Sequence, residues 1–60
     1  MPLYKFTMSG REIVAETTRP DFYAHRLLDA VGDYHLCDVP NGIEGRFGTI
    51  VTWELVNEDS

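Results

Sequence analysis

One short segment of the chain gathers three side chains of the types that bind metals or act as nucleophiles. Asp33, His35 and Cys37 alternate along the sequence, so a β-strand directs them to one side. Carboxylate, imidazole and thiolate all bind zinc, but a structural zinc site takes four protein ligands, and the sequence offers only His25 or a distant carboxylate as the fourth. We therefore expect no metal and no cofactor, and interpret the segment as a strand with polar residues facing outward.

The same segment also suggests a catalytic nucleophile, with Cys37 as the thiol and His35 as the base that would deprotonate it. Side chains two residues apart on one strand lie roughly 6–7 Å apart and do not point at each other, so the base cannot activate the thiol. Cys37 is the one cysteine of the chain, so no internal disulfide can form. No stretch resembles a signal peptide or a membrane span, and we expect a location in the cytoplasm of a bacterium or of a phage-infected host cell.

The first residues suggest a third kind of chemistry. Met1-Pro2-Leu3, together with Gly10-Arg11, is similar to the opening of the tautomerase family, whose chains are of about this length. The resemblance implies that Pro2 acts as a general base through its amine once Met1 has been removed. In that family a long helix follows the first strand, whereas residues 12–18 have a β pattern here and Pro20 interrupts any helix begun at residue 10. We keep this enzyme as a third hypothesis and expect binding instead of catalysis.

Charge is distributed unevenly along the 60 residues, which carry a formal net charge of −5. Residues 1–26 are nearly balanced, whereas residues 27–60 contain seven acidic residues and Arg46 as the one basic residue. Direct nucleic-acid binding is disfavoured, because it requires cations that replace the counterions of phosphate. The pattern favours a basic protein partner, and ordinary solubility charge remains the alternative.

Turn residues divide the chain into strand, strand, helix, strand and strand. A two-residue turn at Ser9-Gly10 predicts that Phe6 faces Ile13 and that Tyr4 faces Ala15. The helix is expected to begin at a Thr18 cap, to present an apolar stripe from residue 23 to residue 31, and to end at Gly32 in the left-handed conformation.

The second half of the chain is predicted to form a hairpin that turns at Asn41-Gly42 and pairs Leu36 with Phe47. Its last strand is expected to be the longest, roughly Arg46 to Val56. One helix covers one face of such a sheet, and the opposite face is expected to carry apolar residues among polar ones. These are Leu3, Val14, Cys37, Val39 and Ile50.

The predicted fold is therefore a single α+β domain spanning residues 1–60, with the order ββαββ and a four-stranded, mainly antiparallel sheet under one helix. This order resembles the β-grasp (ubiquitin-like) topology. The predicted core consists of Tyr4, Phe6, Ile13, Ala15, Leu27, Leu28, Val31, Leu36, Phe47, Val51, Trp53 and Leu55.

Small size, acidity and a single domain resemble the anti-defence proteins of phages and mobile elements, of which the anti-CRISPR proteins are a group. The resemblance implies an inhibitor whose carboxylates occupy the nucleic-acid-binding surface of a basic partner, without membrane contact. The candidate partner-binding residues are Asp29, Asp33, Asp38, Glu44, Glu54, Glu58 and Asp59, with Phe22 as an aromatic anchor that departs from the polar pattern of its helix face. The alternative is a small structural or regulatory domain that forms oligomers through its exposed sheet face.

Overall fold

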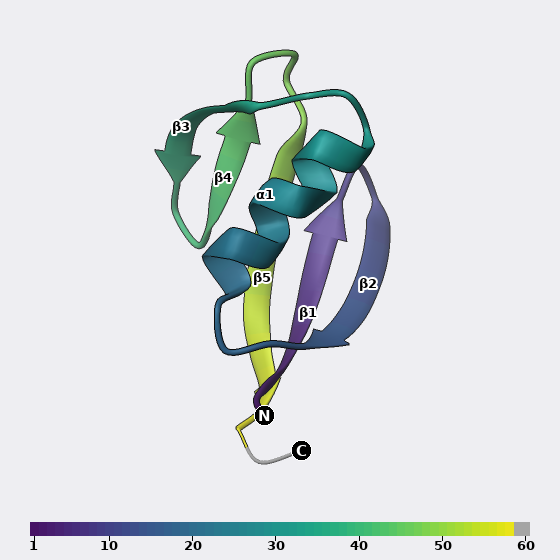
Figure 1. The fold of residues 1–60 in the computed structure, drawn as a ribbon, viewed down its shortest axis with the longest axis vertical. Helices are drawn as coiled ribbons and strands as arrows, with labels where there is room; N and C mark the ends of the chain where they lie inside the picture. Colours follow the sequence, from purple (N-terminus) through teal and green to yellow (C-terminus); the bar gives the residue numbers. More distant parts are fainter. Residues whose placement is uncertain (59–60) are drawn as a thin grey trace.

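The computed structural model describes residues 1–58, and these residues form five strands and one helix. The elements are β1 (Leu3–Met8), β2 (Arg11–Glu16), α1 (Pro20–Ala30), β3 (His35–Val39), β4 (Gly42–Gly45) and β5 (Ile50–Asn57). All neighbouring strands are antiparallel, in the order β2-β1-β5-β4-β3, and α1 lies diagonally across one face of this single sheet (Figure 1). The α+β class is confirmed, but the sheet has five strands, so ββαβββ replaces the ββαββ order on which the β-grasp resemblance rests.

The first hairpin has the register that the sequence predicts. Met8 pairs with Arg11, Phe6 with Ile13 and Tyr4 with Ala15. Ser9 and Gly10 both have positive φ, as a type I′ turn requires, and this turn matches the right-handed twist of the two strands. A local turn signal followed by alternating side chains was therefore sufficient to fix six residue pairs.

The cap position falls one residue later than expected, on Arg19, which makes no side-chain capping hydrogen bond, and the helix begins at Pro20. Proline at the first helical position loses no hydrogen bond, because that N–H has no partner inside a helix. At the other end, the N–H of Gly32 donates to the Asp29 carbonyl and the N–H of Asp33 donates to the Leu28 carbonyl, each at 3.0 Å. With φ of 79° at Gly32, this is a Schellman motif, and the predicted left-handed cap is confirmed.

The last strand begins later than the predicted Arg46: β5 starts at Ile50, and a tight turn joins it to a separate strand, β4, that ends at Gly45. Arg46, Phe47 and Gly48 form a three-residue loop, in which Gly48 has φ of 91° and donates its N–H to the Gly45 carbonyl. Because this turn reverses the chain, Leu36 does not pair with Phe47. Instead β3 turns back into β4 at Pro40-Asn41, and Asp38 pairs with Ile43.

The core lies between α1 and the face of the sheet that the helix covers. Its buried residues are Phe6, Met8, Ala24, Leu28, Ile43 and Val51. Phe6 is at the centre, with its ring stacked on Tyr23 at a centroid distance of 4.7 Å and tilted against Trp53 at 6.4 Å. Among residues 1–58, no helix is long and apolar enough to cross a membrane.

Four residues of the predicted core are exposed: Val31, Leu36, Phe47 and Leu55. Phe47 is at the tip of the three-residue loop, and Val31 is at the end of the helix, where the chain turns away from the sheet. Met8 and Ile43 are buried and were missed. Val51 of β5 pairs with both of them, Met8 on one side and Ile43 on the other. This contact depends on the position of β5 between β1 and β4, which the sequence pattern did not predict.

Candidate functional site

The face of the sheet that α1 leaves uncovered is strongly acidic. The strand registers place Glu12 and Glu16 of β2, Glu44 of β4 and Glu54 of β5 on this side, which we call the open face. Within the described residues, Lys5 is the basic residue that the strand registers place on the open face. Its Nζ lies 3.0 Å from the Glu54 carboxylate and 3.4 Å from that of Glu12. These two hydrogen-bonded carboxylates, Glu54 first, raise the pKa of Lys5, so the lysine stays charged between them.

Apolar side chains stand between these carboxylates, as the sequence predicts. Leu3, Val14, Cys37, Val39 and Ile50 all belong to the open face by register. Val14 is 56% exposed and Ile50 is 46% exposed. The open face therefore combines negative charge with apolar area that water contacts.

A shallow hollow of about 340 Å³ also belongs to the open face. It is lined by Lys5, Thr7, Pro40, Asn41, Thr52, Trp53 and Glu54. Gly42, which pairs with Thr52, contributes no side chain, and a Cβ there would lie 2.9 Å from the Thr52 Cα. Hydroxyls, an amide and a carboxylate line the hollow, so it suits polar groups better than apolar ones.

Asp33, one of the predicted partner contacts, points into the protein and is 4% exposed. Its carboxylate accepts hydrogen bonds from the backbone N–H groups of Tyr34 at 2.7 Å, Phe47 at 3.1 Å and Thr49 at 3.3 Å. Desolvation by itself raises the pKa of this carboxyl group, but the hydrogen bonds from Phe47, Tyr34 and Thr49 outweigh it and the pKa is lowered. Asp33 therefore holds the β4–β5 loop against the end of the helix and is unavailable to a partner.

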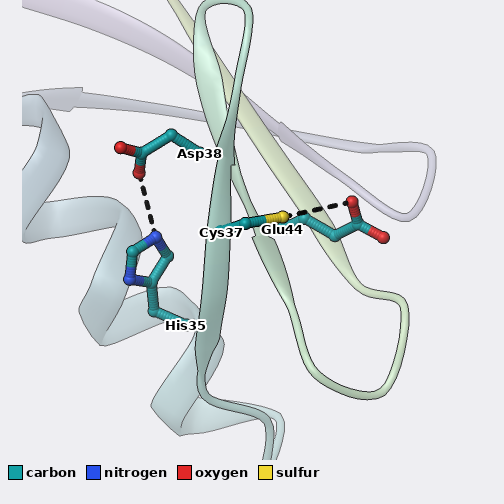
Figure 2. A network of polar contacts seen from close by, with 4 residues as sticks. All are labelled: His35, Cys37, Asp38 and Glu44. Carbon is teal, nitrogen blue, oxygen red and sulfur yellow. Dashed lines mark hydrogen bonds and ion pairs between the residues drawn. The ribbon is translucent and has the colours of Figure 1, made fainter.

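The expected row of Asp33, His35 and Cys37 on one side of a strand does not exist. The β3–β4 register shifts between His35 and Cys37, and this bulge directs the two side chains to opposite faces (Figure 2). On the helix side, the His35 Nε2 lies 2.9 Å from Asp38 Oδ1, and its ring makes an edge contact with His25 at a centroid distance of 4.7 Å. Within residues 1–58, no three His, Cys, Asp or Glu residues are placed to hold a metal ion.

Cys37 faces Glu44 on the open face, with 3.8 Å between Sγ and Oε1 (Figure 2). Desolvation raises the pKa of its thiol, and the negative charge and hydrogen bonding of Glu44 raise it further, with a smaller contribution from Asp38. An environment of this kind suppresses the thiolate that a nucleophile needs. His35 is on the other side of the strand, so it cannot serve as the base.

The remaining predicted contact residues are spread over the molecule. Asp29 is exposed near the end of α1, Asp38 is on the helix side of β3, Glu58 follows β5, and Asp59 lies outside the described residues. Because Asp38 and Glu44 project from opposite faces and Asp33 is buried, the candidate contact residues do not form one continuous patch. Phe22 is 58% exposed on α1, on the side away from the open face.

Sequence reasoning missed an exposed aromatic pair at one end of the sheet. The rings of Tyr34 and Phe47 meet edge to face at a centroid distance of 5.8 Å, and Phe47 is 72% exposed. The Asp33 carboxylate fixes both backbones, because it accepts the N–H groups of these same two residues. Gly48, one residue after Phe47, was the available sign that this aromatic belongs to a turn and not to a core strand.

Comparison of the chain with models of protein families, with curated proteins and with solved structures finds no match in any of the three.

Proposed function

We propose that this protein is a non-enzymatic acidic binding protein that places its open face against a basic surface of a partner protein. The observation that carries the proposal is the gathering of Glu12, Glu16, Glu44 and Glu54 on one uncovered sheet face, with Lys5 as its basic counterpart. The exposed Val14 and Ile50 add apolar area between the charges. Such a face attracts a cationic surface over a distance and can then exclude water from the contact.

The rigidity of the sheet supports a more specific form of the proposal, in which the partner surface normally binds nucleic acid. Glu12 and Glu16 are four residues apart on β2, about 13 Å by the rise of a strand, and Glu54 is on β5, two strands or about 10 Å away from β2, so the sheet holds these carboxylates at fixed spacings. A protein with this face competes with DNA or RNA for the lysine and arginine side chains of the partner. The small size and net charge of −5, which resemble those of anti-CRISPR proteins, agree with an inhibitor of this kind.

Catalysis is the less favoured reading of the same structure. His35 and Cys37 point to opposite faces, and the thiol pKa is raised, which opposes nucleophilic chemistry. The tautomerase hypothesis requires a free amine on Pro2, and detection of a protein that retains Met1 in cells would remove it.

Self-association through the open face is the alternative function. The apolar residues favour it, but two copies of this face stacked on each other also oppose their carboxylates. Sedimentation velocity over a range of protein concentrations and salt distinguishes the two. A dimer that strengthens as salt rises supports self-association, because salt screens the repulsion and leaves the apolar contact.

Two matched variants test the proposed function. The face variant combines Glu44→Gln with Glu54→Gln, and the control combines Asp21→Asn with Asp29→Asn on the helix, so each removes two negative charges. A pull-down from bacterial lysate with the parent protein identifies the partner, and association kinetics are then measured with all three proteins at low and high salt.

We expect the face variant to associate more slowly than the control at low salt, and the difference to shrink as salt rises. The parent should also displace nucleic acid from the partner. Equal association rates for the face variant and the control contradict the proposal that the open face is the binding surface. Binding without displacement contradicts only the nucleic-acid part of it.

A further inference from the structure

The hollow on the open face is built on two adjoining strands in the interior of the sheet. Thr7 of β1 pairs with Thr52 of β5, and two residues further along the same strands Lys5 pairs with Glu54. Because β5 is the middle strand of the five, the hollow lies near the centre of the open face. The centre of a protein interface is where the few residues that dominate the binding energy usually gather.

The turn between β3 and β4 forms one wall of the hollow. Trp53 donates its backbone N–H to the Asn41 carbonyl at 3.0 Å, which holds this turn against β5. Gly42 follows, and a Cβ there would lie 2.9 Å from the Cα and from the Cγ2 of Thr52, so a residue with a side chain would force the turn away from the strand. The wall is therefore in place before a ligand arrives, and binding does not have to order it.

Two hydroxyl groups in the hollow are available for hydrogen bonds to a ligand. Thr7 and Thr52 are both half-buried, and within residues 1–58 neither hydroxyl makes a hydrogen bond. Each hydroxyl can donate one hydrogen bond and accept others. Because these groups are already partly removed from water, a ligand that bonds to them displaces little solvent.

The ion pairs of Lys5 leave part of the Glu54 carboxylate without a cation. The Lys5 Nζ lies 3.0 Å from Oε1 of Glu54 and 3.4 Å from Oε2 of Glu12. The second oxygen of Glu54 remains for another donor, and a partner can reach it because the Glu54 side chain is 65% exposed. One lysine between two glutamates leaves one negative charge uncompensated, so the hollow attracts a cation and repels an anion.

We propose that the hollow binds the guanidinium group of one arginine of the basic partner, between the Glu54 carboxylate and the hydroxyls of Thr7 and Thr52. A guanidinium is planar and carries five N–H donors, so it can bond to the carboxylate and to both hydroxyls at once. An ammonium has three donors on a single atom and is more strongly hydrated, so lysine fits the hollow less well. This inference rests on the proposed function for the basic nature of the partner, and it names the residue that anchors that partner.

The experiment uses three defined probes: the capped peptide acetyl-Gly-Arg-Gly-amide and the same peptide with lysine or citrulline in place of arginine. Citrulline has nearly the shape of arginine but no charge. Binding to the ¹⁵N-labelled protein is followed by NMR at low salt. We expect the arginine peptide to shift the amide signals of Thr7, Thr52 and Glu54 until they saturate, the lysine peptide to bind several-fold more weakly, and the citrulline peptide to leave the signals unchanged.

Two double variants test the hydroxyls without changing the charge of the protein. Thr7→Val with Thr52→Val removes both hydroxyls and keeps β-branched side chains of the same shape on the strands. It should weaken binding of the arginine peptide about tenfold, since the hydrogen bonds from the guanidinium are lost. Thr7→Ser with Thr52→Ser keeps both hydroxyls and should bind the peptide like the parent protein.

Two single variants separate the hollow from the general charge of the open face, and they also serve if the valine variant fails to fold. Glu54→Gln and Glu44→Gln each remove one negative charge from this face, but only Glu54 lines the hollow. Glu54→Gln should weaken binding of the arginine peptide about tenfold or more, because a charge-assisted hydrogen bond is lost, and Glu44→Gln should have a much smaller effect.

The inference is overturned if the parent does not bind the arginine peptide, if the lysine or citrulline peptide binds equally well, if the valine variant binds like the parent, or if the two glutamine variants bind equally. The failure of this inference can be told apart from the failure of the proposed function. If the peptide does not bind but the face variant still loses its partner, the arginine site alone is wrong. If the peptide binds in the hollow but the face variant and its control associate with the partner at equal rates, the proposed function is wrong and the arginine site stands.

Discussion

Leu28→Ala and Leu36→Ala form a matched pair of substitutions in which the same atoms are removed from two different environments. The amphipathic pattern of the sequence places both leucines in the core. In the structure, Leu28 is fully buried under the helix, whereas Leu36 on β3 is 52% exposed. The pair therefore tests the packing of α1 against the sheet separately from the hydrophobicity of the residue.

The expected magnitude follows from burial. Removing a fully buried leucine side chain costs about 2–5 kcal/mol, because the transfer free energy is lost and a cavity remains. At about 0.05–0.15 kcal/mol per residue, 60 residues give a total stability of about 3–9 kcal/mol. Each kcal/mol corresponds to about 4–8 °C in Tm for a domain of this size, so Leu28→Ala should lower Tm by at least about 8 °C, and the upper end of the range unfolds the protein. Leu36→Ala should change stability by less than about 0.5 kcal/mol.

Urea denaturation followed by the fluorescence of Trp53, the one tryptophan, measures both variants. Trp53 is half-buried and its ring is near Phe6, so its emission reports the state of the core. The midpoint should move for Leu28→Ala while the slope of the transition stays the same. An equal loss of stability in Leu36→Ala would show that β3 packs inward, and a stable Leu28→Ala would show that α1 does not cover the core as described.

Three further predictions concern the polar contacts. The pKa of Asp33 is lowered by folding, so its carboxylate stabilises the fold above the unfolded pKa of about 3.9, and this contribution is lost as the pH falls through the folded pKa. The Asp33→Asn variant lacks this carboxylate, so calorimetry over a pH series should show a smaller acid-induced fall in Tm for the variant than for the parent. Gly45→Ala should lower Tm and abolish the Asp33 pH dependence, since the new Cβ would stand 2.5 Å from the Asp33 Cγ and displace the carboxyl group; an unchanged pH profile argues against this contact. Cys37 should react slowly with iodoacetamide at neutral pH despite its exposure, and Glu44→Gln should speed the reaction, whereas equal rates would mean that Glu44 does not affect the thiol.

The parts of the fold that the sequence predicted correctly are those determined by local contacts. The Ser9-Gly10 turn fixes the first hairpin because its register depends only on residues within eight positions of it. The turn at Gly48 was missed because residues 46–56 are rich in strand-forming side chains, and because part of what stabilises the turn is remote. The Asp33 carboxylate that accepts the N–H of Phe47 is 14 residues away in the sequence.

The site was predicted less completely than the fold, because a surface depends on which face each strand presents. Alternation predicts the face of each side chain only while a strand stays regular. The bulge between His35 and Cys37 breaks the alternation, so these two side chains lie on opposite faces although they are two residues apart. Asp33 was assigned to an acidic binding surface because a negative charge just after a helix C-terminus opposes the helix dipole, yet three backbone donors satisfy it in the interior. The apolar members of the open face were predicted correctly: Val14 alternates with Ile13 and Ala15 on the regular strand β2, and Cys37 and Val39 belong to the part of β3 that keeps its register after the bulge.

The central position of β5 has a consequence for how the chain folds during synthesis. β5 lies between β1 and β4 and is made last of the six elements, so the sheet has no middle until residues 50–57 have left the ribosome. Before then, the β1–β2 and β3–β4 hairpins can form only separately, and neither hairpin is stable by itself. Insertion of β5 between them closes contacts that span nearly the whole chain, from Leu3 to Asn57. Pairings of such long range make folding slow for a chain of this length and concentrate it in one late, cooperative step.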